Sequence, residues 1–166
     1  MPHSLDPSSL TPKAALTRLL DGNRRFREGT ASLQNRAYCP VISNQPQRPF
    51  AVVLGCSDSR TPIEILFDEG PGALFVVRVA GNVVAPSVVG SIEFAISQFG
   101  TRLVVVLGHT RCGAVAATAH ALVTGNASES RNIRDITDRI APHIEAHVRA
   151  SAVPESPEFL RQMMRI

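Results

Sequence analysis

Three short apolar runs rich in β-branched residues constrain the fold of this 166-residue chain more than any other feature. They are FAVVLG at 50–55, ALFVVRV at 73–79 and RLVVVLG at 102–108. Runs that are almost continuously apolar are typical of strands buried on both faces of a parallel sheet. We therefore expect these segments to be buried strands of one sheet.

Proline marks the start of two predicted helices. Thr11 followed by Pro12 is typical of an N-cap with proline at the first helical position, and leucines at helical spacing predict a helix over 12–28. The segment Thr61–Glu64 matches a capping box, again with proline at the first position, and predicts a second, short helix. Residues 1–11 are expected to form a loose arm before the first helix.

Three further helices are expected after the second strand. Apolar stripes at helical spacing predict them over 88–99, 113–123 and 133–148. A glycine follows each of the first two stripes, and Pro142 is expected to kink or break the third. Strands that alternate with helices predict an α/β fold with right-handed crossovers. We expect a central, mostly parallel sheet of about four strands flanked by helices, with an N-terminal helical arm.

Length and composition favour one globular domain over residues 1–166, which are enough for a single hydrophobic core. The net charge is +3, but Lys and Arg are interleaved with Asp and Glu, and the chain has one Tyr and no Trp, so nucleic-acid binding is not expected. No stretch approaches the roughly 20 apolar residues of a membrane-spanning helix. The N-terminus lacks the pattern of a secretory signal, so we expect a cytoplasmic protein without a membrane partner.

Metal-ligating residue types follow two of the predicted strands. Cys56 comes directly after the first run and His109 directly after the third, while Cys112 opens the next helix. Ligands of open parallel sheets bind beyond the carboxyl ends of the strands, so we expect these side chains to meet. Two thiolates and an imidazole suit a catalytic Zn²⁺, one per chain, with a fourth position left open. The helix N-terminus is expected to lower the pKa of Cys112, and Cys39 is expected to be a free thiol.

Asp58 and Arg60 strengthen this hypothesis. The spacing of His109 and Cys112 alone is a weak indication of a metal site, because it also arises by chance and buried free cysteines are common. Asp58 and Arg60 alternate with Cys56 in the sequence and share one face if the segment stays extended, which would allow a charge-assisted Asp58–Arg60 bridge beside the metal. The alternative is a simple salt bridge within a loop.

Four separated motifs resemble those of the β-class carbonic anhydrases. They are GCSDSR at 55–60, FVVRVAGN at 75–82, GSIEFA at 90–95 and GHTRCGA at 108–114. The resemblance runs from about Leu16 to the end of the chain. It implies reversible hydration of CO₂ to bicarbonate and a proton by a zinc-bound hydroxide, at an active site built at the interface of a homodimer or larger homo-oligomer.

The resemblance also implies roles for individual residues. In the family pattern Zn²⁺ is held by two cysteines and a histidine, here Cys56, His109 and Cys112. Asp58 would orient the hydroxide, Arg60 would keep Asp58 ionised, and in a closed form Asp58 would become the fourth zinc ligand. Gln47 and Gly113 would contact substrate or bicarbonate. The alternative for Gln47 is a solvated loop glutamine.

The chain departs from the family pattern at two points. Val53 stands where bicarbonate-regulated members carry Trp, so that regulation is not expected here. The family also continues past this length with more helix and an edge strand that this chain lacks, so we expect a truncated C-terminus and an unpaired sheet edge. Two alternative functions stay open: hydrolysis of CS₂ or COS on the same scaffold, and a non-catalytic zinc-binding or redox-sensing protein that uses the three cysteines.

Overall fold

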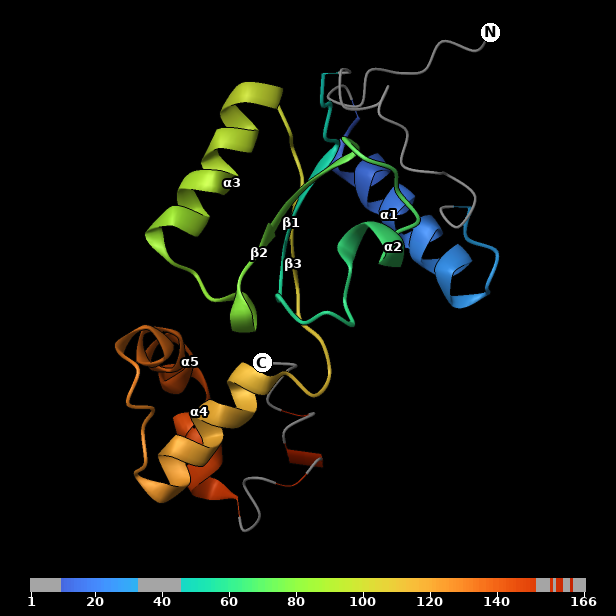
Figure 1. The fold of residues 1–166 in the computed structure, drawn as a ribbon. Coiled ribbons are helices and arrows are strands. Elements are labelled where there is room, and N and C mark those ends of the chain that lie inside the picture. The colour runs from blue at the N-terminus through green and yellow to red at the C-terminus, as the bar shows by residue number, and fades with distance from the viewer. Residues whose placement is uncertain (1–9, 33–45, 152–155, 157, 160–161, 163–166) are drawn as a thin grey trace, which may run out of the picture. The chain divides into compact units, whose positions relative to one another are not determined.

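The computed structural model of the chain describes residues 10–32, 46–151, 156, 158–159 and 162 (Figure 1). They form two compact units. The first, which we call the sheet unit, comprises the described residues up to 54 together with 59–77 and 86–106. The second, the helix-pair unit, comprises 55–58, 78–85 and the described residues from 107 onward. The expectation of one domain over the whole chain stays a prediction.

The sheet has three parallel strands among the described residues, where the sequence predicted about four. They lie in the order β2-β1-β3, with bounds β1 Ala51–Gly55, β2 Leu74–Arg78 and β3 Val104–Leu107. The last residue of each strand belongs to the helix-pair unit. The central strand β1 is buried along its whole length, as its apolar run predicts.

Burial on both faces was a wrong expectation for the two outer strands. In β3, Val104 is 41% and Val106 61% exposed, and β2 is fully buried only at Leu74. Both strands lie at an edge of the sheet, so each has one strand neighbour instead of two. An apolar run indicates that a strand favours burial, but the position of the strand in the sheet determines how far its side chains are buried.

Helices lie on both faces of this sheet (Figure 1): α3 (Pro86–Phe99) on one side, α1 (Pro12–Arg27) and α2 (Ile63–Leu66) on the other. Phe75 of β2 joins α3 to the sheet, because its ring centroid lies 6.3 Å from that of Phe94 and 6.1 Å from that of Phe99. Aromatic rings at such separations pack favourably when tilted. The predicted α/β layering is therefore confirmed.

The two helix starts marked by proline differ in how they are capped. In α1 the Thr11 hydroxyl accepts a hydrogen bond from the backbone N–H of Ala14 at 3.2 Å, which confirms the predicted N-cap. In α2 the N-cap residue is Pro62, and no side chain caps the helix. The helix therefore begins one residue later than the capping-box pattern predicts.

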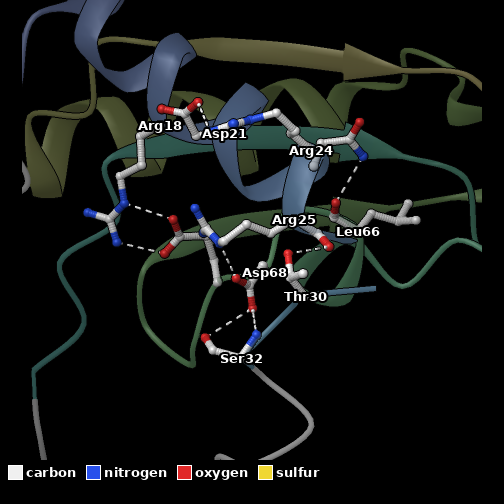
Figure 2. A network of polar contacts seen from close by, with 10 residues as sticks. Arg18, Asp21, Arg24, Arg25, Thr30, Ser32, Leu66 and Asp68 are labelled. Carbon is white, nitrogen blue, oxygen red and sulfur yellow. Dashed lines mark hydrogen bonds and ion pairs between the residues drawn. The ribbon is translucent and has the colours of Figure 1, made fainter. Parts of the chain in front are cut away.

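A network of charged residues ties α1 to the turn between α2 and β2 (Figure 2). Arg18 donates two hydrogen bonds to Glu69, at 2.8 and 2.6 Å, and Arg25 donates to Asp68 at 2.5 Å. Asp68 also accepts the backbone N–H of Ser32 at 2.8 Å. Both carboxylates are buried, so these partners help to compensate their desolvation. The network therefore fixes the N-terminal helix on the sheet unit.

The helix-pair unit is built from α4 (Gly113–Thr124), α5 (Arg131–Ala150) and the short 3₁₀ helix η4 (Ala80–Asn82). The members of its core are Val83, Ala119, Ile140, Ile144, Val148 and Phe159. Gly125, at φ +73°, ends α4 in the left-handed conformation, as its position in the sequence predicts. Pro142 does not break α5, because buried residues on both sides of it hold the helix in the core.

Some predictions fall outside the part of the chain that the structure describes. These are the arm, apart from its last two residues, and Cys39. Among the described residues, no helix is both long and apolar enough to span a bilayer.

Candidate metal centre

The structure brings the three predicted metal ligands together within the helix-pair unit. Cys56 follows β1 directly, His109 follows β3 after one intervening residue, and Cys112 is the N-cap residue of α4. One ligand atom from each residue lies within 4.8 Å of the other two. Within the described residues, this is the one group of three or more potential metal ligands.

Cys56 is held by the end of β2 and the segment that follows it. Its Sγ accepts a hydrogen bond from the backbone N–H of Gly81 at 3.3 Å. Its carbonyl accepts one from Nε of Arg78 at 2.9 Å, and the preceding carbonyl, of Gly55, accepts the N–H of Val79 at 3.1 Å. The thiol is therefore fixed by hydrogen bonds and buried, with the residue only 6% exposed.

Gly81 can approach Cys56 because it lacks a side chain. Its φ is +66°, in the left-handed region that glycine adopts without strain. A Cβ at this position would lie 2.8 Å from Cδ1 of Ile140 and 3.0 Å from Cβ of Ala114. The glycine therefore serves both the backbone turn and the packing of η4 against α4 and α5.

His109 presents one ring nitrogen that has no partner. Its Nδ1 lies 3.0 Å from the carbonyl of Thr110, a separation at which a protonated Nδ1 donates a hydrogen bond. That tautomer leaves the lone pair on Nε2, which is buried and has no hydrogen-bond partner. Buried polar atoms are rarely left unpaired, so this nitrogen requires another explanation. A metal bond beside the two thiols provides one.

Burial raises the pKa of the Cys112 thiol, and this is the largest influence on it. The backbone amides of Val115 and Ala114 at the start of α4 lower the pKa, whereas the neighbouring Cys56 raises it. The expectation of a lowered pKa is therefore wrong, because the loss of hydration exceeds the effect of the helix N-terminus. A metal ion must displace the proton of this thiol when it binds.

The donor set fits a tetrahedral metal site. Ligands of Zn²⁺ at ~2.3 Å for sulfur and ~2.0 Å for nitrogen are separated by about 3.5 to 3.8 Å. Separations of up to 4.8 Å among the three ligand atoms therefore need only a small contraction around an ion. Two thiols and one imidazole leave the fourth position of a tetrahedron open.

Asp58 lies beside the three ligands but outside their group. Its Oδ2 is 4.0 Å from Nδ1 of His109, and its backbone carbonyl accepts a hydrogen bond from Nη2 of Arg78 at 2.6 Å. The side chain of Asp58 is 17% exposed and therefore largely shielded from water. A carboxylate in this position is available as a hydrogen-bond acceptor next to the metal centre.

The other predicted site residues have different locations. Gly113 is the exposed first residue of α4, directly after Cys112. Arg60 and Gln47 are exposed residues of the sheet unit. Gln47 lies next to Gly72, because a Cβ on that glycine would be 3.6 Å from the Cα of Gln47. The roles predicted for these three residues stay predictions.

Two residues that hold the site received no role from the sequence. They are Arg78, the last residue of β2, and Gly81 of η4, which lie in the motif FVVRVAGN and support Cys56. A glycine shortly after a strand indicates a turn or a close approach of the backbone to another group. Nothing in the sequence alone shows which residue it approaches.

Comparison with known proteins identifies the family. The family model described as carbonic anhydrase matches residues 51–165. A carbonic anhydrase of Mycolicibacterium smegmatis is 48% identical over 138 residues, which cover 80% of this chain and 65% of that protein. Carbonic anhydrase 2 of Mycobacterium tuberculosis is 42% identical over 138 residues, which cover 80% of this chain and 64% of that protein. The chain thus spans slightly less than two thirds of these relatives.

Solved structures agree with the sequence comparison. A tetrameric β-carbonic anhydrase of Sordaria macrospora superposes with a TM-score of 0.62 at 23% identity, over 90% of this chain and 74% of the other. A β-carbonic anhydrase of Aspergillus fumigatus gives a TM-score of 0.60 at 25% identity, over 90% and 71% of the two chains. The chain therefore belongs to the carbonic anhydrase family, and its fold is that of the β class.

Proposed function

We propose that this protein catalyses the reversible hydration of CO₂ to bicarbonate and a proton, with one Zn²⁺ held by Cys56, His109 and Cys112. The observation that carries the proposal is the buried, unpartnered Nε2 of His109 within 4.8 Å of two buried thiols. Membership of the carbonic anhydrase family supports the same reaction.

The metal supplies one kind of chemistry at this place: when bound, Zn²⁺ lowers the pKa of a coordinated water to about 7 and so provides a nucleophile at neutral pH. The protein would hold the ion through the thiolates of Cys56 and Cys112 and the neutral imidazole of His109. The backbone carbonyl of Thr110 contributes by accepting a hydrogen bond from Nδ1–H of His109, which keeps the lone pair on Nε2.

The remaining site residues act on the nucleophile and the substrate. The Asp58 carboxylate accepts a hydrogen bond and thereby orients the attacking group towards carbon. Arg60 keeps Asp58 ionised, since a neighbouring positive charge favours a carboxylate. Gln47 and Gly113 bind CO₂ or bicarbonate. In a closed form, Asp58 would become the fourth ligand of the metal and block the reaction.

The proposed assembly is a homodimer or a larger homo-oligomer in the cytoplasm. The Sordaria macrospora proteins with this fold are described as tetrameric, which supports self-association. Cys56 and Cys112 are free thiols in the structure, and thiols persist as metal ligands most readily in a reducing compartment.

The test is a stopped-flow CO₂ hydration assay on protein whose zinc content has been measured. We expect activity in the wild type, loss of zinc and activity in Cys112→Ala, and retained zinc with lower activity in Asp58→Asn. His109→Gln should lose zinc, whereas His120→Gln, on the exposed side of α4, serves as its matched control and should keep both. Full zinc occupancy without hydration would refute the proposed reaction, and activity that survives in Cys112→Ala would refute the ligand assignment.

A further inference from the structure

We propose that Arg78 is a positioning residue, which holds the segment 56–58 in place so that the Cys56 thiol and the Asp58 carboxylate face the metal centre. Arg78 is the last residue of β2. Its guanidinium donates from Nε to the carbonyl of Cys56 at 2.9 Å and from Nη2 to the carbonyl of Asp58 at 2.6 Å. One side chain thus joins both ends of the segment that carries a metal ligand and the predicted orienting carboxylate.

The position of Arg78 at the strand end explains why a side chain is needed there. The backbone pairing of the two strands reaches the hydrogen bond from Val79 N–H to the carbonyl of Gly55. Beyond Gly55 the chain leaves the sheet, and the carbonyls of Cys56 and Asp58 accept from the arginine side chain instead. The guanidinium therefore extends the pairing of β1 and β2 into the loop that holds the site.

Arginine has the geometry for this task. Its donors lie in one rigid plane, so two hydrogen bonds fix the distance between their two acceptors. Hydrogen bonds from a charged donor are also shorter and stronger than neutral ones. The Cys56 end is buried, and there the bond is shielded from water, whereas the side chain of Ser57 between the two acceptors is exposed.

Fixing two carbonyls also fixes where the side chains between them point. The Asp58 carboxylate lies 4.0 Å from Nδ1 of His109, and the Cys56 thiol lies in the ligand group. If the Asp58 carbonyl were released, the peptide could rotate and carry the carboxylate away. Arg78 therefore acts through Cys56 and Asp58 and need not touch the substrate.

The kinetic part of this inference rests on the proposed function, so the experiment includes a readout that does not. Arg78→Met keeps the apolar stem and removes all donors, whereas Arg78→Lys keeps the charge and one donor group. Arg102→Met is the matched control, because Arg102 is an exposed arginine two residues before β3. Each protein is prepared with Zn²⁺ for kinetics and with Co²⁺ for visible absorption, which reports the geometry of the ligands.

Outer partners of metal ligands typically contribute 10- to 100-fold to activity or metal affinity, so we expect kcat of Arg78→Met to fall at least tenfold at full zinc occupancy. KM should change less than kcat, the Co²⁺ absorption bands should shift, and Arg78→Lys should recover part of both. Wild-type kcat and wild-type Co²⁺ bands in Arg78→Met would overturn the inference, as would an equal loss in Arg102→Met. If the zinc-loaded wild type hydrates no CO₂, the proposed function fails, and the Co²⁺ bands alone then decide the role of Arg78.

Discussion

Replacing Gly81 by alanine tests whether the packing of η4 controls the metal centre. At φ +66° an L-residue in the left-handed conformation costs about 1 to 2 kcal/mol. The added Cβ would lie 2.8 Å from Cδ1 of Ile140, which can rotate away, and 3.0 Å from Cβ of Ala114, which can move only with α4. Such overpacking costs about 1 to 3 kcal/mol. The smaller entropy of the unfolded alanine chain offsets about 0.4 to 1 kcal/mol.

We therefore expect Gly81→Ala to lower the free energy of unfolding by about 3 kcal/mol. The assay is urea unfolding of metal-free protein followed by far-ultraviolet circular dichroism, since the chain has no Trp. Metal affinity should also fall, because the N–H of Gly81 that donates a hydrogen bond to the Cys56 sulfur must shift. Loss of a hydrogen-bond partner of a metal ligand typically lowers the affinity about 10- to 100-fold, and we expect a decrease of that size.

Gly90→Ala is the matched control for this substitution. Gly90 lies inside α3, and a Cβ there meets nothing within 4 Å. Alanine is the better helix former, so the control should gain up to about 1 kcal/mol and leave metal affinity unchanged. A second variant isolates the steric part: Ile140→Val removes the clashing methyl group and should cost less in the Gly81→Ala background than in the wild type. A Gly81→Ala protein as stable and as metal-avid as the wild type would refute this account of η4.

Three further predictions concern other parts of the chain. Gly22→Ala should lower the melting temperature more than Gly81→Ala, because its Cβ would lie 1.8 Å from the backbone oxygen of Phe67, and wild-type thermal stability would contradict the close packing of α1 on α2. Asp68→Asn should cost about 2 kcal/mol, measured by urea unfolding, since it removes a charge-assisted hydrogen bond from Arg25; a change below about 0.5 kcal/mol would show that the network adds no stability. Zinc affinity, measured by competition with a coloured chelator, should rise from pH 6 to pH 8, because the raised pKa of Cys112 keeps its thiol protonated over this range, so that metal binding releases a proton and is favoured by higher pH; a flat profile would contradict this.

The grouping of Cys56, His109 and Cys112 was predictable because it depends on local signals. Each ligand follows a strand or opens a helix, and chain topology brings such positions to one region without any knowledge of packing. The first helix was predictable for the same reason, since the Thr11 cap is a contact between residues three apart in sequence. In both cases the residues that determine the feature can be read from short stretches of the sequence.

The predictions that failed depend on neighbours distant in sequence. The exposure of Val106 follows from the place of β3 at the sheet edge, which its apolar run does not encode. The pKa of Cys112 is set mainly by burial, and this exceeds the local helix effect on which the prediction relied. The support of Cys56 by Gly81 joins residues 25 positions apart, so the motif shows the glycine but not its partner.

The placement of the ligands also gives a bound metal a mechanical role. Cys56 precedes β2 and α3, whereas His109 and Cys112 come after β3, so an ion that joins them closes a loop of about 50 residues, as a disulfide would. In the chain-entropy description, closing a loop of that length disfavours the unfolded state by about 4 kcal/mol. The same three side chains that would prepare the nucleophile would then also act as a removable cross-link between segments of the helix-pair unit that are about 50 residues apart in the sequence.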